Sequence, residues 1–312
     1  MNIVVAGGTG FIGRALCAAL GLGGHRVTIL TRNAGQVVKQ PGVSLNPIHW
    51  NGRDTGPWEQ ALEGADAVIN LAGAPIAEAR WTDTRKQLLT DSRVLTTRLL
   101  VRAMSQRSSI PATFISASGI GYYGASDDRR LDEGAARGQG FLADLCLAWE
   151  AEALRAAEFG TRVVLLRTGM VLEEDGGALA KMVLPFKLYA GGPIMPGTQW
   201  VSWIHRRDHI GLIQWALANN GVSGPLNAVA PEAVTMRDFC LRLGHALHRP
   251  SWFPVPEFIL KLALGELGSL MTTGQRVTPR KALEAGYAFH HVTVDSALQA
   301  IFPATAVIRR GA

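Results

Sequence analysis

The sequence predicts an α/β protein in which a doubly wound parallel sheet carries a smaller, mostly helical C-terminal part. Short apolar runs alternate with amphipathic stretches up to Leu172, as strands alternate with helices in a parallel sheet. The first of these runs leads through a glycine-rich turn directly into a helical stretch. Strand-like runs are sparse after this point, so we expect the rest of the chain to close over the carboxyl edge of the sheet.

The first unit reads strand, glycine turn, helix, strand. Residues 2–6 are predicted as a buried strand, 7–13 (GGTGFIG) as a turn, 14–22 as a helix and 25–31 as a second strand. One glycine permits the tight turn, one lets the main chain approach a pyrophosphate, and one lets the helix pack on the strand. The helix N-terminus offers unpaired N–H groups to phosphates. This context predicts a dinucleotide site rather than an ordinary turn. The site residues expected here are Gly7, Gly10, Phe11, Ile12 and Gly13.

The end of the second strand indicates which dinucleotide binds. Sites for NAD usually place Asp or Glu there to hold the ribose 2′-hydroxyl, whereas an Arg accommodates the 2′-phosphate of NADP. This chain has Thr31 and Arg32 at that position and no acidic residue close by. A guanidinium can hold phosphate through two parallel hydrogen bonds. We therefore predict NADP(H) as the cofactor; the alternative is a solvated arginine at the end of a strand.

The remaining elements follow from apolar spacing. Residues 43–50 are a candidate third strand, in which Pro47 favours a loop edge. Further strands are predicted at 65–71, 112–116, 162–167 and 226–229. Helices are predicted at 58–62, 84–107, 141–159, 179–188, 208–219, 236–247 and 258–265, with a last one beginning near Thr278. We assign residues 1–172 to a cofactor-binding domain, with later segments returning to it, and 173–312 to a smaller substrate-side domain.

Bulk properties limit the class of protein. With 312 residues, 47% of them hydrophobic and 18% charged, the chain can bury a large core and has the composition of a globular protein. The net charge of +6 suits anionic small ligands, and the Lys and Arg residues form no long run, so nucleic acid is not an expected partner. No apolar run reaches the roughly 18 residues of a membrane span. No basic leader precedes the first strand, so no signal peptide is expected.

Cysteines and acidic residues bear on location and metal binding. Cys17, Cys146 and Cys240 are far apart in apolar surroundings, which is typical of buried free thiols in a reducing compartment. We therefore expect a cytoplasmic protein. The acid-rich loop at 125–140 lacks the regular alternation of a calcium loop, so we expect it to be solvated and predict no metal site.

Candidate catalytic residues follow the strand at 112–116. Ser118 stands just past this strand, with Tyr122 and Tyr123 next along the chain, where a substrate hydroxyl or carbonyl could be held. The alternative for the two tyrosines is that they only line a pocket. His205 lies in an aromatic and basic stretch and is a further candidate donor, although a structural histidine is the more common outcome.

Several motifs together resemble a known family. They are GGTGFIG at 7–13, NLAG at 70–73, SASGIGYYG at 116–124, RTGMVL at 167–172 and WIHRRD at 203–208. In this order they resemble the extended short-chain dehydrogenase/reductases. The chain is most similar to the atypical, nucleoside-diphosphate-sugar epimerase-like subgroup of NAD-dependent epimerase/dehydratase-like proteins. That narrower likeness rests also on Ser92-Arg93, LPF at 184–186, GGP at 191–193, NAVAP at 227–231 and TPRKALEAGYAF at 278–289.

The resemblance implies a Rossmann-like fold that binds NAD(P), and in this subgroup NADP(H). It places Thr31 and Arg32 at the adenosine 2′-phosphate, Arg93 against the cofactor from the long helix, and Val171 near the nicotinamide end. Ser118 stands at or near the family's catalytic serine. The other residues that it assigns to the cofactor are Leu71, Ala72, Gly73, Ser116 and Ala117.

The chain departs from the family at the catalytic pair. Short-chain dehydrogenases use Tyr-x-x-x-Lys on the helix that Phe141 begins, where the lysine lowers the pKa of the tyrosine. The matching pairs here are Phe141 with Leu145 or Leu142 with Cys146, and neither offers a proton or a cation. Glu150, further along the helix, is interpreted as solvated or paired.

Two functions from different classes remain. The first is an NADP(H)-dependent oxidoreductase or epimerase-like enzyme acting on an unidentified small molecule, as a monomer or homodimer. The second is a non-catalytic NADP(H)-binding redox sensor or scaffold, which the missing Tyr/Lys pair supports. We favour the enzyme because a serine, two tyrosines and a helical cap are retained beside the expected site.

Overall fold

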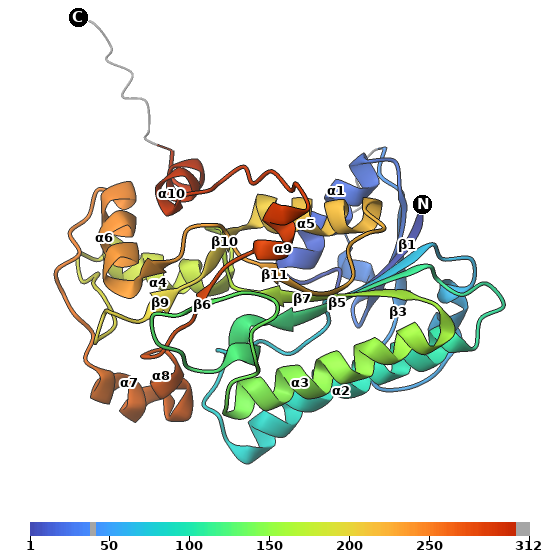
Figure 1. Ribbon diagram of the computed structural model, residues 1–312, viewed down its shortest axis with the longest axis horizontal. Helices are drawn as coiled ribbons and strands as arrows, with labels where there is room; N and C mark the ends of the chain where they lie inside the picture. Colours follow the sequence, from blue (N-terminus) through green and yellow to red (C-terminus); the bar gives the residue numbers. More distant parts are fainter. Residues whose placement is uncertain (38–41, 304–312) are drawn as a thin grey trace, which may run out of the picture.

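A seven-stranded parallel sheet forms the centre of the computed structural model, which describes residues 1–37 and 42–303 (Figure 1). The strand order is β11-β7-β5-β4-β1-β2-β3, and each neighbouring pair is parallel. The strands are β1 (Asn2–Ala6), β2 (Arg26–Thr31), β3 (Leu45–His49), β4 (Ala67–Asn70), β5 (Thr113–Gly119), β7 (Arg162–Thr168) and β11 (Gly224–Ala228). The predicted α/β fold class is confirmed.

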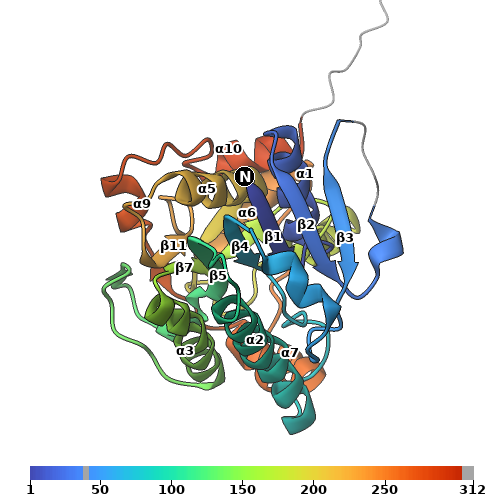
Figure 2. The same ribbon diagram turned by 90° about the vertical axis from the view of Figure 1, so that its right-hand side faces the viewer.

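Helices cover both faces of this sheet, as Figures 1 and 2 show. Helices α1 (Phe11–Leu22) and α5 (Arg206–Ala218) lie on one face, and α2 (Asp83–Ser105) and α3 (Phe141–Leu154) lie on the other. Alternate residues of a strand point to opposite faces, so Val5 packs with Leu16 of α1 while Val4 packs with Leu100 of α2. Two apolar cores result, one on each side of the sheet.

The C-terminal part is attached at the carboxyl edge of the sheet. Strand β8 (Met170–Leu172) follows β7 directly and pairs with β10 (Trp203–His205). Two further short pairings are β9 (Trp200–Val201) with β12 (Val234–Thr235) and β6 (Arg130–Leu131) with β13 (Arg276–Val277). The helices of this part are α4 (Gly177–Lys187), α6 (Met236–Leu247), α7 (Glu257–Leu264), α8 (Glu266–Leu270), α9 (Arg280–Glu284) and α10 (Val294–Ile301). Its own core surrounds Trp203 and Phe239.

Several boundaries differ from those predicted, for physical reasons. Helix α1 begins at Phe11, so it takes in part of the motif that we expected to be a turn. Strand β5 continues to Gly119 because it pairs along its whole length with β7, which places Ser118 inside a strand. Strand β3 does form, and it accommodates Pro47 because it is at the edge of the sheet.

Helical boundaries also shift. Helix α3 ends at Leu154, and the stretch to Phe159 continues as the 3₁₀ turn η4 (Arg155–Phe159). Helix α10, capped by Thr293, was not predicted. The other 3₁₀ turns are η1 (Ala34–Gln36), η2 (Pro57–Leu62) and η3 (Ile120–Tyr123).

The strand order changes direction at β1, and this positions the site. From β1 the sheet grows through β2 and β3 on one side and through β4, β5, β7 and β11 on the other. In such sheets the ligand crevice lies outside the carboxyl ends of the strands at the point of reversal, here between β1 and β4. No helix in the described residues is long and apolar enough to cross a membrane. All three cysteines are buried and unpaired.

Candidate functional site

The glycine turn packs so closely on itself and on the main chain after β4 that Gly7 and Gly13 leave no room for a side chain. Gly7 has φ +80°, and a Cβ there would lie 2.7 Å from the carbonyl carbon of Leu71. A Cβ on Gly13 would lie 2.2 Å from the carbonyl oxygen of Gly7, which the Gly10 amide contacts at 3.0 Å. Gly7 is thus required by the turn and Gly13 by close packing of the helix, whereas a Cβ on Gly10 meets only that oxygen, at 3.3 Å.

The first turn of α1 is open to an anion. Its N-cap is Gly10, which supplies no side-chain hydrogen bond. The amides of Phe11, Ile12 and Gly13 belong to the first helical turn, whose N–H groups lack partners within the helix. No acidic residue occupies this turn to offset the positive end of the helix dipole. A cradle without Cβ atoms beside free amides fits a dinucleotide pyrophosphate.

Phe11 connects this turn to the segment that follows β8. A Cβ on Gly176 would lie 2.5 Å from the Phe11 ring, so the ring packs directly on the main chain there. The guanidinium carbon of Arg206 lies 5.2 Å from the ring centroid, and Arg206 pairs with Glu173 and Asp175 at 3.1 and 2.6 Å. The segment after Val171, which is buried in β8, is therefore held against the start of α1.

Thr31 and Arg32 differ in what they can offer a ligand. Thr31 is buried, and its hydroxyl lies 3.2 Å from that of Thr9 and accepts a hydrogen bond from the Asn33 amide at 3.2 Å. Arg32 is exposed, and its guanidinium makes no hydrogen bond or ion pair with any residue that the structure describes. Thr31 shapes the end of β2, while Arg32 is free to meet an anionic group.

Arg93 packs against the segment that follows β4. It is buried, and its two terminal nitrogens donate to the carbonyls of Leu89 at 3.1 Å and Ala74 at 2.9 Å. A Cβ on Gly73 would lie 3.0 Å from the Arg93 guanidinium carbon. Burial lowers the pKa of Arg93 to about 10. Arg93 thus orders the main chain of residues 73 and 74, next to the crevice.

The residues after β4 and along β5 border the crevice mainly through their main chain. The Leu71 amide donates to the carbonyl of Ala6, and the Ala72 amide donates to the Asn70 side chain at 3.1 Å. Ser116 is fully buried and its hydroxyl donates to the Ala117 carbonyl at 3.3 Å. Because the whole residue is 0% exposed, neither the hydroxyl nor the main chain of Ser116 is open to a cofactor in this structure.

Ser118 belongs to a buried polar network that we did not predict. Its hydroxyl donates to Glu150 Oε1 at 2.7 Å. Glu150 comes from α3 and receives two more hydrogen bonds of 2.8 Å from Arg167 of β7. Ser118, Glu150 and Arg167 are 6%, 6% and 2% exposed, so this serine is directed to a carboxylate inside the protein. Of the two interpretations offered for Glu150, the paired one is correct.

The two tyrosines have different surroundings. Tyr123 is buried; its hydroxyl lies 2.7 Å from the Asn227 side-chain oxygen and accepts from Arg167 at 3.1 Å. Burial raises its pKa. The Tyr122 ring lies under the Arg167 guanidinium at 3.5 Å, but its hydroxyl bonds to no residue in the described part of the chain. Tyr122 is also only half-buried, so its hydroxyl is the one available to a ligand.

The network extends to the acid-rich loop, which is solvated at Asp127 and Asp128 as expected but is paired at Glu133. Glu133 accepts from the Asn227 amide at 3.0 Å and from the Lys281 amide at 3.2 Å. Asp128 accepts from the Trp200 indole at 2.8 Å. These contacts join the loop to β11, β9 and α9. The partners of Asp128 and Glu133 were not predicted because they lie about 70 to 150 positions away in the sequence.

Packing groups occupy the positions of the missing catalytic pair. Leu145 and Cys146 are buried, and the Cys146 thiol contacts the Gly119 carbonyl at 3.6 Å. Burial raises the pKa of Cys146 to about 11, so it stays a thiol near neutral pH. Phe141 and Leu142 are half-buried apolar residues at the start of α3. None of the four can move a proton at neutral pH.

Comparison with known proteins agrees with this geometry. A family model described as "NAD dependent epimerase/dehydratase family" matches residues 3–228, which include the glycine turn and every strand of the central sheet. The chain belongs to the NAD-dependent epimerase/dehydratase family. The family likeness predicted from the motifs is thereby confirmed. A second model, "Domain of unknown function (DUF1731)", matches residues 255–301.

Known relatives align with the chain over nearly its whole length. The chloroplastic SDR39U1 homolog of Arabidopsis thaliana, an epimerase family protein, is 40% identical over 309 residues, covering 96% of this chain and 86% of its own. Epimerase family protein YfhF of Bacillus subtilis is also 40% identical, with 96% and 97% covered. The crystal structure of human SDR39U1 (isoform 2) with NADPH is 35% identical, with a TM-score of 0.84 and 96% and 99% covered.

His205 has a structural role in the chain. Its Nδ1 accepts the Arg207 amide at 3.0 Å, which caps α5, and its ring lies 4.2 Å from that of His291. Burial and the neighbouring His291 lower its pKa to about 4. In the described residues, no group of three or more His, Cys, Asp or Glu side chains could hold a metal ion.

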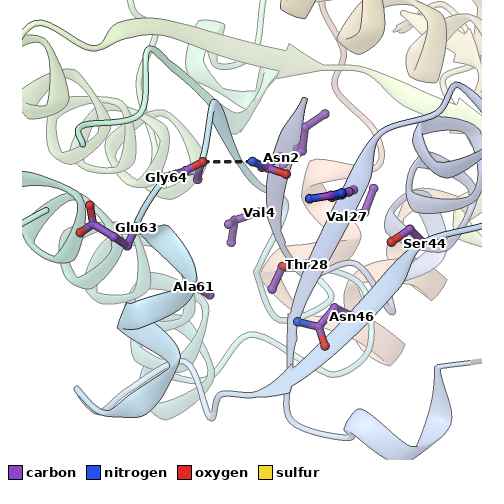
Figure 3. Close-up of a pocket in the computed structure, with 12 residues that line it drawn as sticks. Asn2, Val4, Val27, Thr28, Ser44, Asn46, Ala61, Glu63 and Gly64 are labelled. Atoms are coloured by element: carbon purple, nitrogen blue, oxygen red, sulfur yellow. Dashed lines mark hydrogen bonds between the residues drawn. The ribbon is translucent and has the colours of Figure 1, made fainter. Parts of the chain in front are cut away.

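Two hollows lie at opposite edges of the sheet. The first, of about 260 Å³, is shown in Figure 3 between Asn2, Thr28, Asn46 and Glu63, at the amino ends of the first strands. That edge faces away from the glycine turn, so it does not fit a dinucleotide. The second, of about 220 Å³, lies beside the Gly121–Gly124 turn and is lined by Phe141 and Leu142.

Proposed function

We propose that the chain binds NADP(H) in the crevice between β1 and β4 and uses it to reduce a small substrate. The observation that carries this is the side-chain-free cradle of Gly7 and Gly13 beside the uncapped first turn of α1. The human relative, 35% identical, crystallised with NADPH, which supports the same ligand here. Among the residues present, the main chain from Gly10 to Gly13 would hold the pyrophosphate.

Arg32 supports NADP(H) rather than NAD(H). It is exposed at the end of β2, beside the buried Thr31, and forms no contact in the described residues that a phosphate would have to displace. No carboxylate stands at that strand end to hold a ribose 2′-hydroxyl or repel a phosphate.

The chain's own residues would supply binding, orientation and a proton. When bound, the nicotinamide supplies a hydride. The Tyr122 hydroxyl would donate a proton to the developing alkoxide of the substrate and recover it from solvent. The Arg167 guanidinium over the Tyr122 ring would hold that ring in place. Ser118, bonded to Glu150, and Tyr123, bonded to Asn227, would position the β5 turn rather than react.

A non-catalytic NADP(H)-binding sensor is the second candidate. It is favoured by the absence of the proton-relay pair, whose matching residues here are Phe141 with Leu145 or Leu142 with Cys146, and by the burial of Ser118. The partners and location that we predicted stay predictions: a small-molecule substrate, no nucleic acid or membrane, a monomer or homodimer, and the cytoplasm.

Titration of intrinsic fluorescence with NADPH and NADH tests the proposed cofactor. The parent protein should bind NADPH at least tenfold more tightly, and Arg32→Ala should remove the difference because a charge-assisted phosphate contact contributes about 1.5–3 kcal/mol. Arg26→Ala, at the other end of β2 and also exposed, is the matched control and should keep the preference. Equal binding of both nucleotides by the parent would refute the role of Arg32.

Turnover separates the enzyme from the sensor. Purified protein is mixed with NADPH and a panel of small aldehydes and ketones, and nicotinamide absorbance is followed. Substrate-dependent loss of NADPH supports the enzyme. Tight NADPH binding without turnover on any member of the panel would favour the sensor.

A further inference from the structure

Five large apolar side chains are exposed together at the end of α4 and in the segment that follows α6, at the end of the molecule opposite to β3 (Figure 1). They are Leu184, Leu188, Tyr189, Trp252 and Phe253, and each is between 57% and 69% exposed. The Trp252 indole N–H donates to the Tyr189 carbonyl at 2.9 Å, and the Trp252 and Phe253 amides both donate to the Gly191 carbonyl at 3.1 Å. These bonds hold the two segments side by side. We call the five residues the α4 patch.

The main chain of the α4 patch is fixed, although its side chains meet solvent. Tyr189 follows α4 with φ +61°, in the left-handed region where glycine is usual and a bulky residue is strained. Its amide donates to the Phe186 carbonyl at 2.9 Å, and the Arg249 guanidinium carbon lies 4.5 Å from its ring centroid. The fold thus holds an aromatic ring outward at a cost in strain. A surface that is ordered before binding loses less entropy when a partner covers it.

The exposed area of the α4 patch is large for a chain that works alone. Aromatic side chains carry about 150–250 Å² each and leucine is near the lower end, so five residues at these exposures present roughly 600 Å². The largest apolar patch on a typical monomer is about 300–600 Å². Each partner in a dimer of ordinary size covers about 800 Å². Three further exposed residues extend the patch towards that area, namely Pro185, Ala190 and Pro254.

The charges around the α4 patch favour a second copy over a negatively charged surface. Lys187 pairs with Glu174 at 3.1 Å. Arg249 stacks on the Tyr189 ring and forms no ion pair with any residue that the structure describes. An anionic membrane attracts a protein by about 1 kcal/mol for each Lys or Arg near it, so one unpaired arginine contributes little. The same near-neutral balance means that two copies of the patch do not repel each other strongly.

We propose that the α4 patch is the interface of a homodimer, in which a second copy of this chain covers it. A two-fold dimer brings the same patch of both copies together, so it requires a surface that complements itself. An apolar and nearly neutral patch meets that requirement. Trp, Tyr and Arg are the residues most enriched at the centres of interfaces, and Trp252, Tyr189 and Arg249 lie in contact here.

Sedimentation velocity of the full chain over a range of micromolar concentrations tests the proposal. The parent should sediment with twice the mass of one chain. Leu188→Arg and Phe253→Arg each place a charge in the patch of both copies, and each should raise the dissociation constant of the dimer at least tenfold. An arginine at residue 188 also suits the C-terminal end of the α4 dipole, so this variant should keep its fold. Leu147→Arg, at an exposed position of α3, is the matched control and should sediment like the parent.

Several outcomes would overturn the proposal. They are a parent that stays monomeric at every concentration, a dimer that a folded patch variant leaves intact, and a dimer that Leu147→Arg weakens as much as the patch variants do. Circular dichroism shows which variants are folded, and only folded ones are compared. Flotation of the parent with vesicles of phosphatidylcholine and phosphatidylglycerol is the second measurement. A monomeric parent that floats with the vesicles, and that Leu188→Arg releases, would assign the α4 patch to a lipid surface instead.

Discussion

Arg167 and Glu150 form a two-point ion pair inside the protein, with Nε–Oε1 and Nη2–Oε2 distances of 2.8 Å each. The pair joins β7 to α3 on the side of the sheet where the standard Tyr/Lys pair would stand. It also holds the Ser118 hydroxyl through Glu150 and the Tyr123 hydroxyl through Arg167. The geometry of the β5 turn therefore depends on this buried pair.

Breaking the pair from one side should destabilise the fold strongly. Glu150→Gln leaves the Arg167 charge buried without a counter-ion, and we expect the free energy of unfolding to fall by about 3–5 kcal/mol. Urea titration followed by circular dichroism measures this. Replacing both partners, with Glu150→Leu and Arg167→Met, should recover part of the loss because no buried charge remains.

The matched control for this prediction is a surface ion pair on the same helix. Glu152 of α3 pairs with Arg98, which is half-exposed. The Glu152 side chain is 12% exposed and also pairs with Arg155, but both arginine side chains are more than half exposed, so Glu152→Gln should cost about 1 kcal/mol or less. A loss at Glu150 no greater than that at Glu152 would contradict the structural role of the buried pair.

Gly10→Val should abolish nucleotide binding without unfolding the protein. A Cβ at residue 10 meets only the Gly7 carbonyl oxygen, at 3.3 Å, so the turn must shift by only a few tenths of an ångström, but the added branches would project where a pyrophosphate must approach the α1 amides. Calorimetric titration with NADPH should show no binding, and the melting temperature should stay within a few degrees. A variant that still bound NADPH would place the nucleotide elsewhere.

Gly13→Ala should behave differently. Its Cβ would lie 2.2 Å from the Gly7 carbonyl oxygen and 2.7 Å from the Gly8 Cα, so the turn and α1 must separate. We expect loss of stability as well as binding, seen as a lowered unfolding midpoint. Gly35→Ala, where nothing lies within 4 Å of the new Cβ, is the control. If Gly13→Ala melted like Gly35→Ala, the close packing of the turn would be wrong.

Tyr122→Phe and Tyr123→Phe should distinguish a catalytic role for Tyr122 from a structural role for Tyr123. If the protein oxidises NADPH, Tyr122→Phe should lower kcat at least tenfold with unchanged NADPH affinity and stability, because only the free hydroxyl is removed. Tyr123→Phe should instead cost about 1–3 kcal/mol of unfolding free energy, since Asn227 and Arg167 lose a buried partner. Steady-state kinetics and urea titration of both variants check this. Normal turnover by Tyr122→Phe would remove it from the mechanism.

Stability should fall as the pH drops from about 7 towards 4. Burial lowers the pKa of His205, and of the fully buried His209 of α5, to about 4, whereas an unfolded histidine titrates near 6.5. Between these values the unfolded chain binds more protons, so acid favours unfolding, by up to about 1.4 kcal/mol per pH unit for each histidine. Urea titrations between pH 7 and 5.5 measure the slope. His205→Asn keeps a side chain that can cap α5 and should remove the contribution of one histidine to the change of unfolding free energy with pH. An unchanged slope would show that protonation of His205 does not cause the loss of stability.

Local constraints made the fold class and the glycine turn predictable. Gly13 is required by contacts with Gly7 and Gly8 inside one βαβ unit, and Gly7 by its positive φ, so their spacing along the chain carries this information. The contact of Gly7 with the main chain of Leu71 forms only in the folded chain. The alternation of apolar runs likewise follows from which face of each element is buried. The ends of elements were less predictable. Strand β5 reaches Gly119 only because β7 pairs with it, and the local sequence does not encode that pairing.

The polar network could not be predicted, because its members meet only in the folded chain. Ser118, Glu150, Arg167 and Asn227 come from β5, α3, β7 and β11, and the Tyr123 hydroxyl contacts Asn227 across 104 positions. Two features of the sequence indicated buried charges without identifying the residues that pair with them. Arg167 follows the apolar run VVLL in β7, and Glu150 follows Trp149 on the buried face of α3. A charge in such a position needs a partner, but spacing does not identify which one.

A crystal structure of the chain grown with NADPH would show where the nucleotide binds. We expect the pyrophosphate against the amides of the α1 first turn and the 2′-phosphate within hydrogen-bond reach of the Arg32 guanidinium. Nucleotide bound at any other place, or a crevice between β1 and β4 that NADPH at saturating concentration leaves empty, would contradict it.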